Sequence, residues 1–260
     1  MNDSLYIAAT GMHMQQKGVD TISNNLANVN TPGFKKGKVS FEDLVYRDLN
    51  GAAASLDSGA AGRMWQGGGV GIGSMVKSFA TGTLKQTDQA MDLAIEGDGF
   101  LEVVALDGAP AYSRGGTLTV DKDGFLATAS GYALKPSIHI GNDAREVSIK
   151  ADGRVFVRSR DDSEASEVGR IELVRFADMS GLVPLGSNLY KSSERSGDAI
   201  AARAGEDGAG MLAQGFVEGS NVNLVEEMVD LMVAKRAYET SLKVIQASDE
   251  MLAMSNNLRK

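Results

Sequence analysis

Apolar side chains recur every seven residues near the start of the chain. The repeat has two columns, with Leu5, Met12, Val19 and Leu26 in the first and Ala8, Ile22 and Val29 in the second. These are the a and d positions of a heptad, and they predict an amphipathic helix of about 25 residues, roughly 38 Å long. Because so narrow an apolar stripe buries little surface within one helix, we expect this helix to pack against another.

The C-terminal segment carries the same kind of repeat. One column holds Leu224, Leu231, Tyr238, Ile245 and Leu252, and the other holds Met228 and Leu242, interrupted by Lys235, Asp249 and Asn256. Asn223 stands at the N-cap position and Glu226 at the capping-box position, so a second helix is expected from residue 224 onward. A further column widens its apolar face and indicates contact with more than one neighbour: Val244, Met251 and Leu258.

Small residues form another column on the first predicted helix. Gly11 and Gly18 share one heptad position with Ser4 and Asn25. Each glycine destabilises a helix interior by about 1 kcal/mol relative to alanine. Either the helix tolerates them, or a neighbouring backbone approaches closely at this face, and we favour the close approach.

The first helix is expected to end within the segment SNNLANVNTPGFKK, residues 23–36. Pro32 disfavours the α conformation at the residue before it, and Gly33 permits a tight turn. Phe34 can then anchor the chain where it leaves the helix. Amide capping of the helix end accounts for Asn30 and is a second role open to Asn28.

Two further asparagines of this segment, Asn24 and Asn25, lie inside the predicted helix, where asparagine is mildly unfavourable. Adjacent helical positions point about 100° apart. We therefore expect the two amides to serve two different neighbours and to set a polar register between subunits of an assembly.

Between the terminal helices the pattern changes to period two. Five short strands are predicted: Phe100–Leu106, Thr117–Asp121, Ser137–Ile140, Arg154–Val157 and Arg170–Phe176. Asp-Gly pairs supply hairpin turns between them, at residues 107–108, 123–124 and 152–153. These strands and turns predict an all-β domain. Gly- and Ala-rich stretches flank it at residues 50–73 and 192–210.

The predicted fold class is α+β, with long terminal helices pairing as a coiled coil around a central β domain. The expected boundaries are an N-terminal helix segment at 1–36, an extended connector at 37–80, the β domain at 81–196, a return connector at 197–219 and the C-terminal helix at 220–260.

Composition excludes several kinds of partner. The formal net charge is -8 and no run of basic residues offsets it, which disfavours nucleic acid and anionic membranes. No window reaches the ~20 apolar residues of a membrane span, and the start of the chain lacks the basic region of a secretory signal. With no cysteine and only His13 and His139, thiol chemistry is excluded and a zinc site is not expected.

Candidate catalytic and ligand motifs are weak. GGGVGIG, residues 67–73, matches no phosphate-binding pattern, and DKDG, residues 121–124, lacks the later ligands of a calcium loop. Asp121 and Asp123 could form the carboxylate pair of a glycan hydrolase, but they occupy a predicted turn rather than a cleft. We therefore expect neither a catalytic site nor a cofactor. A soluble binding module or adhesin would share the β domain without needing the full-length apolar helices.

Several segments together resemble a known family. SLYIAATGM, NNLANVNTPGFKK and FEDLVY near the start, and EGSNVNLVEEMVDLMVAKRAYE near the end, are similar to the axial proteins of the bacterial flagellum. Among these, the rod and hook family, the distal rod type is the most similar. The residues that fall in these motifs include Asn24, Asn25, Asn28, Pro32, Gly33, Phe34, Asn221 and Asn223. The central segments 92–103, 111–126 and 182–190 also match in order, although Leu101 and Gly115 depart from the usual family residues.

The resemblance implies a structural subunit. Family members stack helically into a hollow, torque-transmitting rod that crosses the periplasm, with the terminal helices as an inner coiled-coil core and the β domain facing the bushing rings. They are exported through the flagellar type III apparatus without a cleaved signal, and they contact other rod and hook proteins. A proximal rod subunit is the nearest alternative, and a hook protein is the next.

Overall fold

The computed structural model describes residues 2–44, 46–48, 65–105, 108–141, 144–159 and 164–257. The chain divides into two compact units. Unit 1 contains the described residues within 1–27, 37–76 and 223–260, and unit 2 contains those within 28–36 and 77–222. The chain therefore passes between the units four times.

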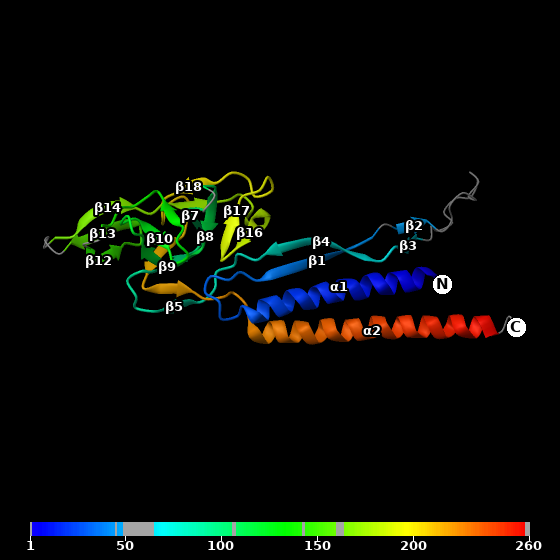
Figure 1. Ribbon diagram of the computed structural model, residues 1–260. Helices are drawn as coiled ribbons and strands as arrows, with labels where there is room; N and C mark the ends of the chain where they lie inside the picture. The colour runs from blue at the N-terminus through cyan, green and yellow to red at the C-terminus, as the bar shows by residue number, and fades with distance from the viewer. Residues whose placement is uncertain are drawn as a thin grey trace, which may run out of the picture. The chain divides into compact units, whose positions relative to one another are not determined.

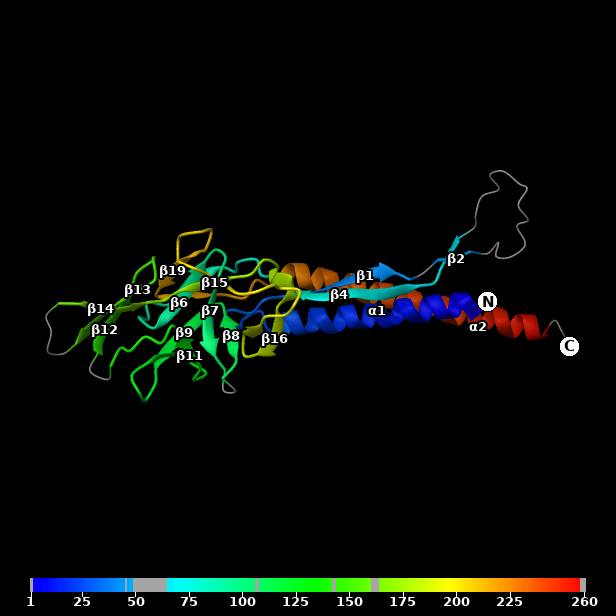
Figure 2. The same ribbon diagram turned by 90° about the horizontal axis from the view of Figure 1, so that it is seen from above.

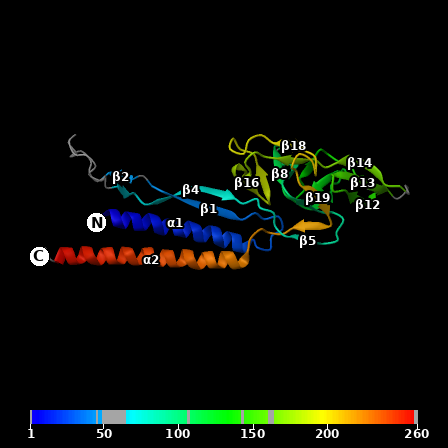
Figure 3. The ribbon, with the colours of Figure 1, turned by 180° about the vertical axis from the view of Figure 1, so that it is seen from behind.

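Two long helices dominate unit 1. Helix α1 (Asn2–Ala27) and helix α2 (Leu224–Asn257) lie side by side and run in opposite directions in all three views of the ribbon (Figures 1, 2 and 3). Asn223 caps α2 as predicted, because its Oδ1 accepts from the backbone N–H of Val225 at 3.1 Å. Helix α1 ends at Ala27, so Val29 of the predicted heptad lies outside it.

A two-stranded ribbon lies along α1 in the same unit. Strand β1 (Gly37–Asp43) pairs with β4 (Val70–Lys77), and β2 (Tyr46–Asp48) pairs antiparallel with β3 (Trp65–Gly67). The expected connector at 37–80 thus contains paired strands. The alternation of Val39 and Phe41 with polar residues in β1 is too short to identify a strand by itself, and most of the β1 side chains are exposed.

Unit 2 is built mainly from short antiparallel strands. Its largest sheet has the order β16-β17-β8-β7-β11-β10-β9-β6-β19, with β15 pairing both β7 and β18. The strands are β6 (Asp92–Glu96), β7 (Phe100–Val104), β8 (Pro110–Ser113), β9 (Gly115–Val120), β10 (Leu126–Thr128), β11 (Ala133–Lys135), β15 (Leu173–Arg175), β16 (Val183–Gly186), β17 (Leu189–Lys191), β18 (Ile200–Ala202) and β19 (Met211–Gln214).

Two smaller sheets complete unit 2. One has the order β12 (Ala144–Ile149), β13 (Arg154–Ser159) and β14 (Ser166–Arg170), and the other pairs β5 (Leu84–Gln86) with β20 (Phe216–Glu218). A 3-10 helix, η1 (Met179–Gly181), precedes β16. The expected return connector at 197–219 therefore contributes three strands, β18, β19 and β20, each too short to show a clear period.

The strand predictions are partly correct. β7, β9 and β13 confirm three of the five. Residues 137–140 form only an isolated bridge between His139 and Phe125, and the predicted strand at 170–176 is interrupted between β14 and β15. The turns at Gly124 and Gly153 are confirmed, and both glycines have a positive φ; the third turn includes Asp107, outside the described residues. The α+β class is confirmed by the two helices and the central strands.

Unit 2 contains two buried clusters. The larger is aliphatic and includes Leu93, Ile95, Leu101, Leu126 and Leu173. The smaller is aromatic, and its rings meet edge to face: Phe79, Phe100, Tyr112, Phe176 and Tyr190. This packing fixes the strands that position the charged residues described below.

Candidate assembly sites

Helix α2 turns one heptad face toward α1. Apart from Ala237, its buried and half-buried positions alternate in steps of four and three residues: Glu227, Leu231, Ala234, Tyr238, Ser241, Ile245, Ser248 and Leu252. The predicted column of Leu231, Tyr238, Ile245 and Leu252 is one half of this face. The other half is a column of small or polar residues rather than the predicted Met228 and Leu242, which are exposed.

Two contacts define the register of the helix pair. The Asn25 amide donates to Glu227, and a Cβ added at Gly11 would contact the Ser241 hydroxyl. These contacts lie fourteen residues apart on each helix, which is two heptads. At these two positions, Asn25 and Gly11, the small-residue column of α1 faces the column of α2 that holds Glu227 and Ser241, in an antiparallel arrangement.

Asn25 holds three parts of unit 1 together. It is only 2% exposed, and its Nδ2 donates to the Gly37 carbonyl and to the Glu227 carboxylate, each at 3.0 Å. Its Oδ1 accepts from the Gly37 N–H at 2.8 Å. The expectation that Asn25 serves another subunit is corrected, because these donors and acceptors are used within the chain. Asn24, one position earlier, is exposed.

The two glycines of α1 have different neighbours. A Cβ at Gly11 would lie 3.8 Å from the Ser241 hydroxyl, and one at Gly18 would lie 3.7 Å from the Phe41 ring on β1. Both are ordinary contacts with side chains, so the expected close approach of a backbone is not present at either glycine within the chain.

The predicted apolar column of α1 is half-buried rather than fully buried. Leu5, Met12, Val19, Ile22 and Leu26 all have intermediate exposure. The most buried apolar residues of α1 are Ala8 and Met14, and Met14 belongs to neither predicted column. Because the β1–β4 ribbon lies along a second face of α1, residues outside the heptad are also covered.

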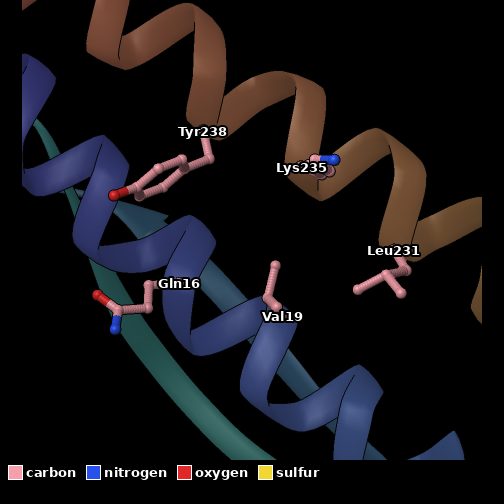
Figure 4. Close-up of a pocket in the computed structure, with 5 residues that line it drawn as sticks. All are labelled: Gln16, Val19, Leu231, Lys235 and Tyr238. Atoms are coloured by element: carbon pink, nitrogen blue, oxygen red, sulfur yellow. The ribbon is translucent and has the colours of Figure 1, made fainter.

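A groove separates the two helices near their middle. Val19 of α1 and Leu231 and Tyr238 of α2 project into the space between the helices, and Gln16 and Lys235 complete its lining (Figure 4). The groove has a volume of about 360 Å³ and its walls are mainly apolar. It brings together three residues that the heptad pattern singled out, Val19, Leu231 and Tyr238.

In unit 2 the segment after α1 forms the predicted turn. The Thr31 hydroxyl donates to Asn28 Oδ1 at 3.1 Å, and the carbonyl of Pro32 accepts from Asn188 Nδ2 at 2.7 Å. Gly33 has a φ of +68° and its N–H donates to the Glu218 carbonyl. Phe34 is buried beneath the Lys77 ammonium, which lies 4.4 Å from the ring centroid.

Asn221 connects three of the four points at which the chain enters or leaves unit 2. Its Oδ1 accepts from the Lys36 N–H at 2.7 Å, and its Nδ2 donates to the carbonyls of Ser78 and Ala80 at 2.8 and 3.0 Å. Asn221 itself immediately precedes the last of these points, at Val222. One side-chain amide thus holds three chain segments that are far apart in sequence.

A buried ion cluster lies beside this amide. The Lys35 ammonium donates to Glu218 at 2.7 Å and to the Ala80 carbonyl at 2.9 Å, and Arg114 approaches the other carboxylate oxygen at 3.4 Å. The three side chains are 2% exposed or less. Burial lowers the pKa of Lys35, and the Arg114 guanidinium lowers it further, while Glu218 opposes the shift. Arg114 also donates to the carbonyls of Gly97 and Gly99. We call Lys35, Arg114, Glu218 and Asn221 the clasp.

Asn221 was among the residues expected from the sequence, whereas its three charged neighbours were not. Arg114 lies in the central segment 111–126, and Lys35 and Glu218 lie within the quoted terminal motifs; membership of these motifs was the available signal. Their pairing joins residues 183 positions apart, and no local pattern indicates such a contact.

The weak catalytic motifs remain without a site. Asp121 and Asp123 are exposed in a turn, and His13 and His139 are exposed on different elements. Within the part of the chain that the structure describes, no three His, Asp or Glu side chains are placed to hold a metal ion, and no helix is long and apolar enough to span a membrane.

Comparison with known proteins gives consistent matches along the whole chain. Residues 5–35 match the family described as flagella basal body rod protein, residues 94–157 the flagellar hook protein FlgE/F/G D1 domain, and residues 213–258 the flagellar basal body rod FlgEFG protein C-terminal family. The chain is 41% identical to the flagellar basal-body rod protein FlgG of Borreliella burgdorferi, over all of both chains. It is 40% identical to FlgG of Buchnera aphidicola, over 99% of this chain and 100% of that one. Identity to FlgF of Caulobacter vibrioides is lower, 31% over 96% of this chain and 95% of that one.

Proposed function

The chain belongs to the flagellar basal-body rod protein family as a structural subunit of the distal rod, and on that premise we propose that the α1–α2 pair is its assembly element. The observation that carries this proposal is the heptad face of α2, which covers α1 over most of the length of both helices. The chain is not an enzyme, and its role is to form part of the rod of the basal body.

The helix pair is proposed to act as a coiled coil. The alternation of four and three residues on α2 is the spacing of a and d positions, and the antiparallel register repeats after two heptads. Small residues at one position and large ones at the other would let the helices approach closely while Leu231, Tyr238 and Ile245 fill the seam. Many copies of such a pair would form the inner core of the rod.

The clasp is proposed to carry load within unit 2. Torque has to pass through the chain segments that enter and leave this unit, and Asn221 and Glu218 bind those segments to each other. Buried, fully hydrogen-bonded groups hold a defined geometry better than exposed ones because every alternative arrangement leaves a polar group unsatisfied. The clasp would therefore resist slippage between segments.

The partners follow from the family. We propose contacts with other rod and hook proteins at the ends of the rod, with the bushing rings around it, and with the flagellar type III apparatus during export without a cleaved signal. Unit 2, with its wide strand surface, is the part proposed to face the rings.

The test is genetic and structural. In cells whose own copy of this gene is deleted, we expect no distal rod in purified basal bodies and no swimming, and both should return when the full-length chain is supplied. Electron microscopy of the basal bodies reads out the rod, and mass spectrometry establishes that it contains the chain. Complete distal rods in the deleted cells would contradict the proposed function.

A further inference from the structure

Helix α2 exposes an apolar stripe on the side that does not face α1. Val225, Met228, Val229 and Met232 have 70, 51, 47 and 55% of their surface exposed. Their spacing is i, i+3, i+4 and i+7, which places them on one face over two helical turns. Four large apolar side chains exposed together on one helix face indicate a surface that a partner covers.

The groove between α1 and α2 offers a complementary surface. Val19 of α1 and Leu231 and Tyr238 of α2 give it apolar walls (Figure 4). An amphipathic helix with anchors at i, i+3, i+4 and i+7 is the kind of ligand that such a groove accepts. Stripe and groove use different residues of α2, so one copy can use both at the same time.

Charge favours the same pairing. The segment of α2 that carries the stripe, residues 224–234, contains no basic residue and exposes the carboxylates of Glu226 and Asp230, whereas Glu227 is buried against Asn25. The groove is bordered by Lys235, whose side chain is 74% exposed and whose ammonium lies at the long distance of 4.0 Å from Glu239 on the same helix. An acidic helix segment would thus be attracted to a groove with a cation at its edge, and this attraction would favour one orientation over others.

We propose that the groove of one copy binds the stripe of a second copy of this chain. The proposal rests on the proposed function, since it names the surfaces through which the rod subunits meet. The contact is heterologous, because a groove meets a stripe rather than another groove. Each copy then has one groove and one stripe to offer, and such contacts generate open helical assemblies when the rotation does not close a ring.

The absence of cysteine makes the contact measurable by cross-linking. Two single-cysteine variants, Val19→Cys in the groove and Met228→Cys in the stripe, are expressed together in cells that lack the native gene. Any disulfide between positions 19 and 228 must then join two copies. The matched control replaces Met228→Cys by Met254→Cys, since Met254 is similarly exposed on α2 but lies outside the stripe.

After oxidation of isolated basal bodies, we expect a covalent dimer between positions 19 and 228, several-fold more abundant than the dimer between positions 19 and 254. Rods that assemble with no excess of the 19–228 dimer would overturn the groove assignment and leave the proposed function standing. A disulfide from position 19 or position 228 to an engineered cysteine in a different axial protein, in place of the 19–228 dimer, would also overturn it. Complete distal rods in cells that carry no copy of this chain would instead refute the proposed function.

If Met228→Cys itself blocks assembly, a charge variant provides a second test of the proposed contact. Lys235→Glu should reduce the number of complete rods several-fold, because it places a carboxylate opposite an acidic helix segment. Lys243→Glu, an equal charge change at another exposed position of α2, should leave the rods intact. Equal effects of the two variants would refute the proposed contact.

Discussion

At the residue scale, the most unusual feature is a carboxylate that joins two buried cations. Glu218 accepts from Lys35, from the Gly82 N–H and from Arg114, and all three charged side chains are withdrawn from water. Removing solvent from charges costs free energy, which is recovered only when each charge keeps its partners. A single change in this cluster therefore has a larger effect than a change in an exposed ion pair.

Glu218→Gln is expected to destabilise unit 2 by about 3 to 5 kcal/mol, because it leaves Lys35 and Arg114 buried without their counter-charge. Urea unfolding followed by the fluorescence or circular dichroism of the full chain measures the loss. Glu102→Gln, which removes the partner of the exposed Lys135, serves as the control and should have a small effect. Equal losses in both variants would refute the role assigned to the clasp.

Tyr190 gives a prediction on pH. Burial raises its pKa to about 12, the Arg114 guanidinium opposes the rise, and the Glu218 carboxylate adds to it. The unfolded chain releases the phenolic proton near pH 10, so the contribution of Tyr190 to stability is complete below that pH and is lost between about 10 and 12, roughly 3 kcal/mol in all. Tyrosinate absorbance should show a late-titrating tyrosine that Tyr190→Phe removes. An unchanged titration curve in the variant would contradict the prediction.

At the element scale, the helix pair depends on a polar contact at one end and on small residues along its length. Asn25 joins α1 to the start of β1 and to the first turn of α2, which are separated in sequence by 12 and 202 residues. Ala234, Ser241 and Ser248 then keep the two helices close. Apolar burial is modest along this pair, so its geometry depends on these specific contacts more than on the size of its core.

Asn25→Ala should lower the free energy of unfolding by about 1 to 3 kcal/mol for each buried polar group that it leaves without a hydrogen-bond partner. Hydrogen exchange is the suitable measurement, because the Gly37 amide donates directly to Asn25 and should lose its protection first. Ser23→Ala, at an exposed position of the same helical turn, should leave that amide protected. Retained protection at Gly37 in Asn25→Ala would show that another group satisfies the amide.

At the scale of the whole molecule, the division into two units separates folding from assembly. The clasp and both buried clusters lie within unit 2, whereas the helix pair, the groove and the stripe lie within unit 1. Loss of α2 should therefore abolish assembly without unfolding the strands of unit 2.

A chain that ends at Val222 is expected to keep the strand content of unit 2 and the high pKa of Tyr190, yet to enter no rod. Circular dichroism and tyrosinate titration report the first part, and basal bodies from cells carrying only the shortened chain report the second. The full-length chain with Lys243→Glu is the control for assembly. Rods built from the shortened chain would exclude α2 as the assembly element.

The local features were predictable from the sequence, because each depends on neighbouring residues. The seven-residue repeats indicate the two helices, Asn223 marks the start of α2, and the Pro32–Gly33 pair marks the turn after α1. The terminal motifs also suffice to place the chain in its family, since they are short, contiguous and specific.

Tertiary structure decided which residues meet. The heptad pattern pointed to Met228 and Leu242 as the second column of α2, but the helix turns Glu227, Ala234, Ser241 and Ser248 toward α1, where the Asn25 amide binds Glu227 and Gly11 lies opposite Ser241. Asn25 forms its hydrogen bonds with residues of the same chain, and Lys35 pairs with Glu218, which is 183 residues away in sequence. Periodicity reports how side chains are distributed around one element, whereas a buried contact between distant segments depends on the path of the whole chain.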